Sequence, residues 1–295
     1  MSAVILDGKA LSLKIREDVK VRATSVKEKG IVPCLAVVLV GEDPASLSYV
    51  KSKEKALEEA GMESRDIRLP YETSEEQLLS IIGDLNKDKT VHGILVQSPV
   101  PKHIDEENVT ASIAPEKDVD CFHPVSVGSM ILERKGFLPC TPHGVLALLR
   151  EYNVPVAGAH VAVVGRSNIV GKPLANLLVR REYNATVTLC HTGTKDLKRH
   201  TLQADILVAA AGRPYIIKPE MIKEGAAVID VGINRVEDAS SKKGYRVCGD
   251  VDPAVEQKAG FFTPVPGGVG PMTIAMLLQN VVQAAAASIE GGKAK

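Results

Sequence analysis

Residues 161–173, VAVVGRSNIVGKP, place a glycine-rich loop between an apolar run and a segment that can form a helix. Doubly wound α/β sheets bind the pyrophosphate of a dinucleotide at such a loop, on backbone amides at the N-terminus of the following helix. The spacing Gly165-x-Ser167-x-x-x-Gly171-x-Pro173 differs from the GxGxxG fingerprint. A tight turn without a ligand therefore stays an alternative to a cofactor loop.

The next apolar run indicates which dinucleotide binds. ATVTLC, residues 185–190, is followed by His191 and Thr192 and by no acidic residue. Enzymes that use NAD often place Asp or Glu at this strand end, where the carboxylate binds the ribose hydroxyls. Here no acid repels a 2′-phosphate, and Arg166 in the preceding loop can pair with one. The sequence therefore favours NADP over NAD.

Strand-like and helix-like segments alternate on both sides of this loop. From residue 142 onward, HVAVVG, ATVTLC, ADILVAAAG and AAVIDVG predict strands, GKPLANLLVRRE (171–182) predicts a helix, and YRVCGDV (245–251) completes the series. An earlier series contains the apolar runs CLAVVLVG (34–41) and VHGILVQ (91–97). Alternation of this kind is typical of parallel sheets, so we expect an α/β protein whose second series is a Rossmann-like doubly wound unit.

The length of 295 residues favours two domains. The Pro- and Gly-rich stretch TPVPGGVGP, residues 263–271, resembles a crossing back from the second series to the first. We therefore expect a discontinuous first domain of residues 1–141 plus 267–295, and a second domain of residues 142–266.

Composition argues against several classes of protein. The formal net charge is zero and no basic block is present, which argues against nucleic acid or an anionic membrane as the main partner. Five scattered cysteines without a CxxC pair suit a reducing compartment and neither a disulfide framework nor a zinc site. The seven histidines lack HxxxH spacing, so we expect no metal.

Two segments bear on localisation. The apolar run before Asp7 is too short for a signal peptide, which favours a cytoplasmic protein. Residues 271–289 carry no charge and approach membrane-spanning length, but Gln279, Asn280 and Gln283 interrupt them. Their apolar residues repeat at helical spacing, so we expect a buried helix of a soluble protein.

The lysine-rich stretch SYVKSKEK, residues 48–55, contains a candidate catalytic group. Tyr49 and Lys53 are four residues apart and share one helical face, whereas Lys51 and Lys55 point elsewhere. Gln97 lies at the carboxyl end of a later strand, the edge where open α/β sheets bind ligands, so these three side chains can converge. A solvated lysine face without chemistry is the alternative.

Eight motifs, in order along nearly the full chain, resemble those of the methylenetetrahydrofolate dehydrogenase/cyclohydrolase family. They are SYVKSKEKA, VHGILVQSPVP, APEKDVD, PCTPHGV, VVGRSNIVGKP, ADILVAAAG, VIDVGIN and TPVPGGVGPMT. The resemblance implies a cytoplasmic homodimer of one-carbon metabolism. It would oxidise 5,10-methylenetetrahydrofolate with NADP, then hydrolyse the methenyl product to 10-formyltetrahydrofolate.

The resemblance also implies roles for individual residues. Tyr49 and Lys53 match the family's Tyr-x-x-x-Lys pair, Gln97 its strand-end glutamine, and Asp120 its pterin-binding acid. Further substrate contacts are expected from Pro264, Gly267 and Gly268. Cofactor contacts are expected from the loop and strand-end residues Gly165, Arg166, Ser167, Gly171, Pro173, His191 and Thr192. The resemblance adds Ile169, Val170, Ala211, Gly212, Gly232, Ile233 and Thr273. Thr273 can also cap the final helix.

The chemistry of the two reactions suits these residue types. Loss of hydride from the methylene carbon needs alignment more than a proton acceptor, because the neighbouring nitrogen supplies electron density. Hydrolysis requires water to lose a proton, and a lysine with an ordinary pKa near ~10.4 is a poor base at neutral pH. A cleft wall and the bound cation would favour the neutral amine. We therefore expect Lys53 to act in hydrolysis and Tyr49 to stack on the aminobenzoyl ring.

Two positions depart from the family pattern. Cys121 follows DVD where a glycine is usual, so its Cβ could shift Asp120 or narrow the pocket; Ser98 replaces a larger apolar residue. Three other functions remain open: a monofunctional NAD(P)-dependent dehydrogenase, a reductase of the shikimate dehydrogenase type, and a non-catalytic NADP-binding sensor. Retention of Lys53 and Gln97 argues against the first, and TPVPGGVGPMT argues against the second.

Overall fold

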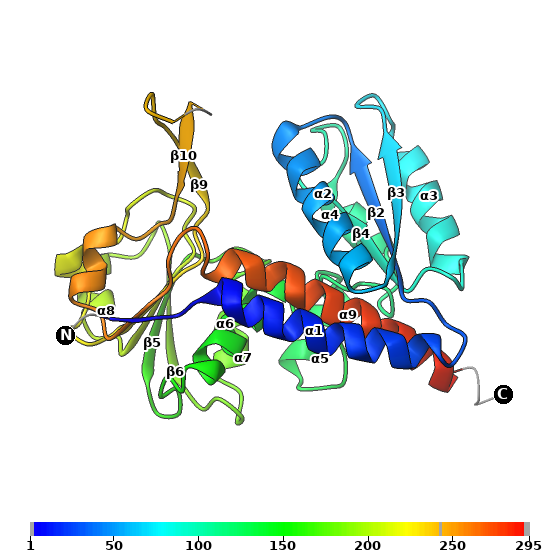
Figure 1. Cartoon of the computed structure of the whole chain (residues 1–295). Helices are drawn as coiled ribbons and strands as arrows, with labels where there is room; N and C mark the ends of the chain where they lie inside the picture. Colours follow the sequence, from blue (N-terminus) through cyan, green and yellow to red (C-terminus); the bar gives the residue numbers. More distant parts are fainter. Residues whose placement is uncertain (1–2, 242–243, 292–295) are drawn as a thin grey trace. The chain divides into compact units, whose positions relative to one another are not determined.

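A computed structural model describes residues 3–241 and 244–291, and the chain divides into two compact units (Figure 1). The six-stranded unit contains Met1–Ser12 and Pro139–Thr273, and the three-stranded unit contains Leu13–Leu138 and Ile274–Lys295. Helices α1 (Gly8–Lys27) and α9 (Val269–Gly291) each contribute residues to both units.

The six-stranded unit has one parallel sheet in the order β1-β11-β8-β7-β5-β6. Its strands are β1 (Val4–Ile5), β5 (His160–Val164), β6 (Thr186–Cys190), β7 (Ile206–Ala209), β8 (Ala227–Asp230) and β11 (Phe261–Phe262). Strand β5 lies between β6 and β7, so the direction of winding reverses at β5. This confirms the predicted doubly wound α/β fold and places its switch point between β5 and β7.

Helices and short 3-10 turns connect these strands. They are α6 (Cys140–Glu151), α7 (Gly171–Leu178), α8 (Leu197–Thr201), η1 (Pro219–Met221) and η2 (Pro253–Gln257). The helix predicted over residues 171–182 is too long, because the chain turns after Leu178. Asn184 adopts a φ of 55°, and the amides of Tyr183 and Asn184 both donate to the carbonyl of Arg180.

One expectation about this unit is wrong. The segment YRVCGDV does not extend the large sheet: β10 (Tyr245–Cys248) pairs antiparallel with β9 (Asn234–Glu237) as a separate hairpin. Strand β1 joins the edge of the six-stranded sheet beside β11, so residues 3–12 group with this unit. The amide of Val4 donates to Gly260 O at 2.8 Å, and the side chain of Leu6 is fully buried. The expected domains of residues 1–141 plus 267–295 and of residues 142–266 stay a prediction.

The three-stranded unit has a parallel sheet in the order β3-β2-β4. The strands are β2 (Cys34–Val40), β3 (Glu63–Leu69) and β4 (Gly93–Val96), and the helices are α2 (Pro44–Glu59), α3 (Glu75–Lys87), α4 (Glu106–Ser112) and α5 (Pro124–Ile131). Figure 1 shows α2 and α3 on opposite sides of this sheet. Side chains at alternate positions of β2 pack against the buried Leu78, Ile82 and Leu85 of α3, as the two-residue strand repeat requires.

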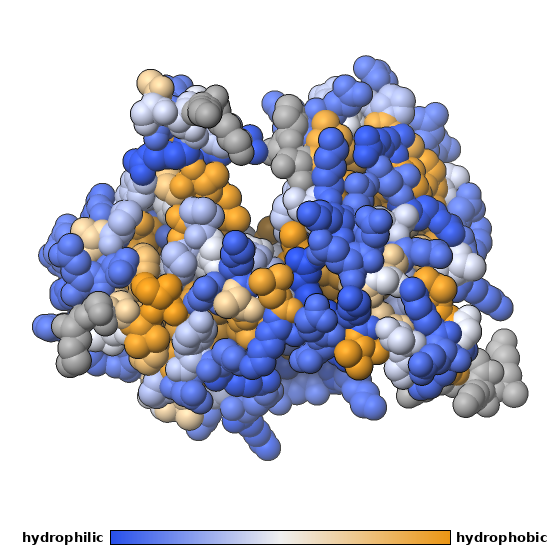
Figure 2. All heavy atoms as spheres, viewed as in Figure 1, coloured by the Kyte–Doolittle hydropathy of each residue, from blue (hydrophilic) through white to orange (hydrophobic). Residues whose placement is uncertain are grey.

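Helix α9 is long and apolar enough to span a membrane by length and composition, yet more than half of its apolar stretch is buried inside the protein. Its Asn280 side chain is 1% exposed and donates hydrogen bonds within the three-stranded unit. On the face drawn in Figure 2, hydrophilic residues predominate and apolar residues form separate patches. These features are those of a helix in a protein core.

Candidate active site

Lys53, Tyr49 and Gln97 meet in the three-stranded unit. Lys53 lies on α2 and is only 5% exposed. Its Nζ donates to Gln97 Oε1 at 3.0 Å and lies 4.4 Å from the centroid of the Tyr49 ring. Gln97 directly follows β4, and its backbone amide donates to Val38 O at 2.8 Å, which continues the pairing with β2. The helical face and the strand end therefore converge.

The other lysines of this stretch are exposed. Lys51 faces solvent, and the side chain of Lys55 is 77% exposed beside Glu59. The side-chain nitrogen Nε2 of Gln97 donates to Ser98 O at 2.8 Å, so the side-chain oxygen Oε1 is oriented toward Lys53. A solvated lysine face thus describes Lys51 and Lys55 and does not describe Lys53. Gln97 holds the Lys53 amine without adding a charge.

Asp120 is half-buried in a turn of the same unit. The amide of Cys121 donates to Asp118 O at 3.0 Å, which closes the turn. The Asp118 carboxylate is 2% exposed and accepts hydrogen bonds from the amides of Phe122 (3.1 Å) and His123 (2.8 Å). Asp118 therefore holds the loop together, whereas Asp120 lies in the turn that this loop supports.

Asn280 of α9 fixes this turn from the other side. Its Nδ2 donates to Val119 O at 2.7 Å and to Leu138 O at 3.0 Å, so both amide protons are used. The sequence pattern marked Asn280 only as an interruption of an apolar helix. The available signal was an amide side chain within an apolar helix, since such a group needs hydrogen-bond partners when it is buried.

Replacing Asn280 with leucine is expected to lower the free energy of unfolding by about 2 kcal/mol, because two carbonyl groups lose their donor. The midpoint of urea unfolding measures this change. Gln283→Leu is the control, since Gln283 on the same helix donates to Gly136 O at 3.1 Å from an exposed position. Equal midpoints for the two variants would show that the Asn280 bonds do not stabilise the turn.

Cys121 occupies a backbone conformation that favours glycine. Its φ is 59°, its side chain is fully buried, and its Sγ donates to Phe137 O at 3.2 Å. The left-handed φ gives a physical reason why glycine suits this position. Here the added Cβ and sulfur are accommodated inside the core next to Phe137.

The glycine-rich loop of the six-stranded unit joins β5 to α7. Gly165 has a φ of 130°, and a Cβ there would overlap the carbonyl of Ala210. A Cβ on Gly171 would overlap the carbonyl of Gly165. Ser167 Oγ accepts from the amides of Val170 (3.2 Å) and Gly171 (3.3 Å). Gly165 therefore lets the loops after β5 and β7 meet at the switch point, and Gly171 lets the start of α7 pack against the end of β5.

The other predicted cofactor residues follow neighbouring strands of this sheet. Arg166 is exposed, His191 and Thr192 follow β6, Ala211 and Gly212 follow β7, and Gly232 and Ile233 follow β8. All of them lie at the carboxyl ends of parallel strands, the edge at which such sheets bind ligands. Ile169 and Ile233 are 49% and 66% exposed, so each offers an apolar surface next to a loop. Val170 is half-buried and Pro173 is buried in α7.

The segment before α9 is tightly packed. Gly267 has a φ of 113°. Gly268 is buried, and it packs so closely against Gly8 that a Cβ on Gly8 would overlap the carbonyl of Gly268. Pro264 O accepts from the amide of Gly268 at 2.8 Å. Its glycines therefore serve the close packing of a crossover segment, and contacts from Pro264, Gly267 and Gly268 to substrate stay a prediction.

The expectation that Thr273 caps α9 is wrong, because the helix begins at Val269. The Thr273 hydroxyl instead bonds to the hydroxyl of Thr141 at 2.9 Å.

The sequence pattern did not single out two buried carboxylates of the six-stranded unit. Asp230 ends β8 and Asp250 follows β10; they are 2% and 0% exposed. Asp230 accepts hydrogen bonds from the amides of Gly232, Asp250 and Val251, each at 2.9 Å. Burial and the neighbouring Asp250 raise the pKa of Asp230 to about 6, although the three amide bonds oppose the rise. Asp230 comes from a motif quoted for the resemblance, but only the fold brings the two acids together.

The raised pKa of Asp230 predicts a pH dependence of stability. Its pKa rises on folding from the usual 3.8 to about 6, so its stabilising contribution is present below pH 3.8 and is lost as pH rises to 6. The unfolding free energy of the wild type minus that of Asp230→Asn is expected to fall by about 2 to 3 kcal/mol from pH 4 to pH 7. Chemical denaturation across this range measures the difference, and a difference that stays constant would contradict the assignment.

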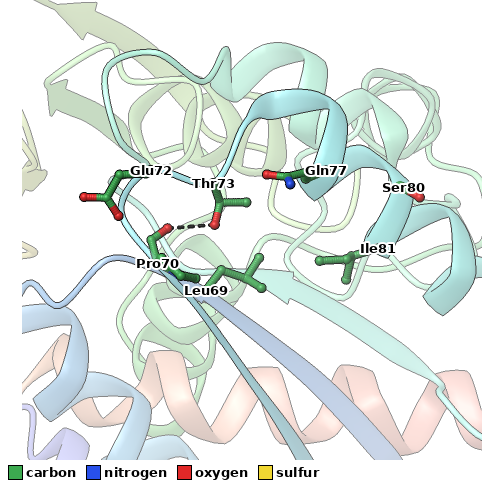
Figure 3. Close-up of a pocket in the computed structure, with 7 residues that line it drawn as sticks. All are labelled: Leu69, Pro70, Glu72, Thr73, Gln77, Ser80 and Ile81. Atoms are coloured by element: carbon green, nitrogen blue, oxygen red, sulfur yellow. Dashed lines mark hydrogen bonds between the residues drawn. The ribbon is translucent and has the colours of Figure 1, made fainter.

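A cavity of about 550 Å³ lies elsewhere in the three-stranded unit, between the end of β3 and helix α3 (Figure 3). Leu69 and Ile81 line it, and Thr73 Oγ1 donates to Pro70 O at 2.7 Å. None of the predicted site residues lines this cavity. Within residues 3–241 and 244–291, no group of three or more His, Cys, Asp or Glu side chains is arranged to hold a metal ion.

Known protein families match this chain in two segments, one for the catalytic domain and one for the NAD(P)-binding domain. The family model of the tetrahydrofolate dehydrogenase/cyclohydrolase catalytic domain matches residues 6–120, and that of the family's NAD(P)-binding domain matches residues 139–289. The bifunctional protein FolD of Halalkalibacterium halodurans is 57% identical over 286 residues, covering 97% of this chain and 99% of that protein.

Solved structures agree with the sequence comparison. The crystal structure of the bifunctional enzyme FolD from Campylobacter jejuni is 49% identical with a TM-score of 0.92, over 97% of this chain and 99% of that one. The Trypanosoma brucei enzyme, complexed with NADP cofactor and inhibitor, is 39% identical with a TM-score of 0.93, over 98% and 99%. The chain described here belongs to the tetrahydrofolate dehydrogenase/cyclohydrolase family.

Proposed function

We propose that this protein oxidises 5,10-methylenetetrahydrofolate with NADP and hydrolyses the methenyl product to 10-formyltetrahydrofolate, with Lys53 activating the water. The observation that carries the proposal is the buried amine of Lys53, 3.0 Å from Gln97 Oε1 and 4.4 Å from the Tyr49 ring, in a chain that matches both domains of the family.

The six-stranded unit fits NADP. Gly165 and Gly171 allow the loop after β5 to pack closely against the start of α7, and a helix N-terminus stabilises a pyrophosphate. Arg166 offers an exposed cation for the 2′-phosphate, and the residues that follow β6, His191 and Thr192, carry no carboxylate that would repel it. When bound, NADP accepts the hydride from the methylene carbon. The chain's part in this step is to align the carbon with the cofactor, which calls for no proton acceptor.

Hydrolysis uses the polar group on α2. As the water oxygen bonds to the cationic methenyl carbon, a proton passes from the water to Lys53 Nζ, and the π electrons of the C=N bond return to nitrogen. The bond from this carbon to N5 then breaks: the new hydroxyl loses its proton as the formyl C=O forms, and N5 gains a proton. The cation of the bound substrate disfavours a second positive charge on this buried amine. The Gln97 oxygen keeps Nζ in place, and the Tyr49 ring lies beside it for stacking on the aminobenzoyl group. Asp120 accepts hydrogen bonds from the amino-pyrimidine edge of the pterin.

The protein is cytoplasmic, in keeping with five buried cysteines that all keep their thiols. It is also a homodimer, as the family resemblance implies. Sedimentation equilibrium measures the mass: about twice that of the chain is expected, and a monomer at micromolar concentration would contradict the dimer.

An absorbance assay for methenyltetrahydrofolate tests the proposal. With methylenetetrahydrofolate and NADP, the bifunctional enzyme forms the methenyl compound and then consumes it, and it consumes added methenyl compound without NADP. Formation without accelerated consumption would identify a monofunctional dehydrogenase. Binding of NADP with no turnover of either folate would identify a sensor.

A further inference from the structure

The Asp250 carboxylate organises the loops at the carboxyl edge of the six-stranded sheet. Its Oδ2 accepts from the amides of Ala211 (2.6 Å) and Gly212 (2.8 Å). Its Oδ1 accepts from the amide of Arg213 and from Asn234 Nδ2, each at 2.9 Å. One buried carboxylate thus ties three consecutive amides after β7 to the segment after β8.

Glycines make this arrangement possible. A Cβ on Gly232 would overlap the Asp250 carboxylate, and a Cβ on Gly249 would overlap the Asp230 carboxylate. Asp250 therefore fills the space beside Gly232, which lies two residues after Asp230. Asp230 in turn fills the space beside Gly249, which directly precedes Asp250. The motifs VIDVGIN and CGDVD are two halves of one structure, which explains why Asp and Gly occur together in both.

The engaged amides restrict how this edge can bind a dinucleotide. Three consecutive amides after a strand would form an anion site, but here a carboxylate of the protein already occupies them. The loops after β7 and β8 can therefore contact the cofactor only through their outer surfaces. Those surfaces include Ala211, Gly212 and the 66% exposed Ile233.

We propose that Asp250 is a positioning residue for the nicotinamide half of NADP, because it sets the loops after β7 and β8 against which that half lies. This inference rests on the proposed function, in which the adenosine half with its 2′-phosphate lies at the end of β6, near Arg166 and His191. Since β6 and β8 lie on opposite sides of β5 and β7, the two halves of the dinucleotide contact different loops.

Binding measurements on Asp250→Asn test this role. The variant keeps the size of the side chain but turns an NH₂ group toward backbone amides that need an acceptor. The Kd for NADPH, measured by its fluorescence, is expected to rise at least tenfold. The Kd for adenosine 2′,5′-bisphosphate is expected to stay within twofold, because that fragment lacks the nicotinamide half. Hydrolysis of the methenyl compound should keep its wild-type kcat and KM, since Lys53 lies in the other unit.

Asp205→Asn is the matched control. The Asp205 carboxylate accepts a hydrogen bond from the backbone amide of His160 at 2.9 Å, at the amino end of the same sheet. Replacing this carboxylate should leave both dissociation constants unchanged. NADPH affinity within twofold of wild type in folded Asp250→Asn would overturn the inference. An equal loss of affinity for NADPH and for the adenosine fragment would overturn it too, because it would indicate a general loss of structure.

A second variant keeps the inference testable if Asp250→Asn does not fold. Asn234→Ala removes only the side-chain donor to Asp250, and it is expected to raise the Kd for NADPH about three- to tenfold with the same selectivity. Unchanged NADPH affinity in this variant would contradict the inference. Absence of NADPH binding in the wild type would instead refute the proposed function.

Discussion

Lys53→Met is expected to lower the rate of methenyltetrahydrofolate hydrolysis by about 10² to 10⁴, the usual contribution of a general base. Methionine is close to lysine in length and suits a buried position, so α2 should fold unchanged. Oxidation of the methylene substrate needs alignment and no base, and its rate is expected to fall by less than about tenfold. Separate initial rates with each folate, measured on one preparation, give both numbers.

Lys55→Met is the control on the same helix. The Lys55 side chain is 77% exposed, so both activities should remain close to those of the wild type. A Lys53→Met enzyme that hydrolyses the methenyl compound at nearly the wild-type rate would show that another group takes the proton. Parallel losses of both activities would indicate that Lys53 only orients the substrate.

Gly165→Ala is expected to weaken NADP binding by more than about 100-fold. The added Cβ would overlap the Ala210 carbonyl, and a φ of 130° is strained for any side chain. The loop after β5 must therefore move away from the switch point, which removes the amides that hold the pyrophosphate. Titration with NADPH measures the loss, and hydrolysis of supplied methenyl compound reports on the other unit.

Gly158→Ala separates the two causes of this effect. Gly158 also has a positive φ, 77°, but a Cβ added there would meet no atom of the described residues within 4 Å. Its substitution should lower stability by about 1 kcal/mol and leave NADPH affinity unchanged. Gly165→Ala with wild-type affinity for NADPH would refute the assignment of this loop to the cofactor.

Local periodicity was sufficient to predict the centre of the candidate site. The four-residue spacing of Tyr49 and Lys53 set their common helical face, and the rule for parallel sheets placed Gln97 near them; the hydrogen bond between Lys53 and Gln97 agrees with both. Strand β5, which precedes Gly165, was equally predictable, because an apolar run that ends at a glycine identifies a buried strand without knowledge of its partners.

What the sequence could not predict depends on contacts between distant segments. The two-residue strand β1 is too short for a periodic signal, and only its pairing with β11 assigns it to the six-stranded unit. The contacts of Asp230 and Asp250 depend on the hairpin of β9 and β10 returning the chain to β8. Asn280 likewise reaches Val119 across 161 residues of chain. Such partners follow from the tertiary fold, which no local pattern encodes.

The amount of methenyl compound that accumulates during turnover tests the central role of Lys53 most directly. Lys53→Met, supplied with methylenetetrahydrofolate and NADP, should build up methenyltetrahydrofolate in near-equal amount to NADPH, while the wild type keeps it low under the same conditions. If the variant makes NADPH and its methenyl level stays as low as that of the wild type, Lys53 does not activate the water.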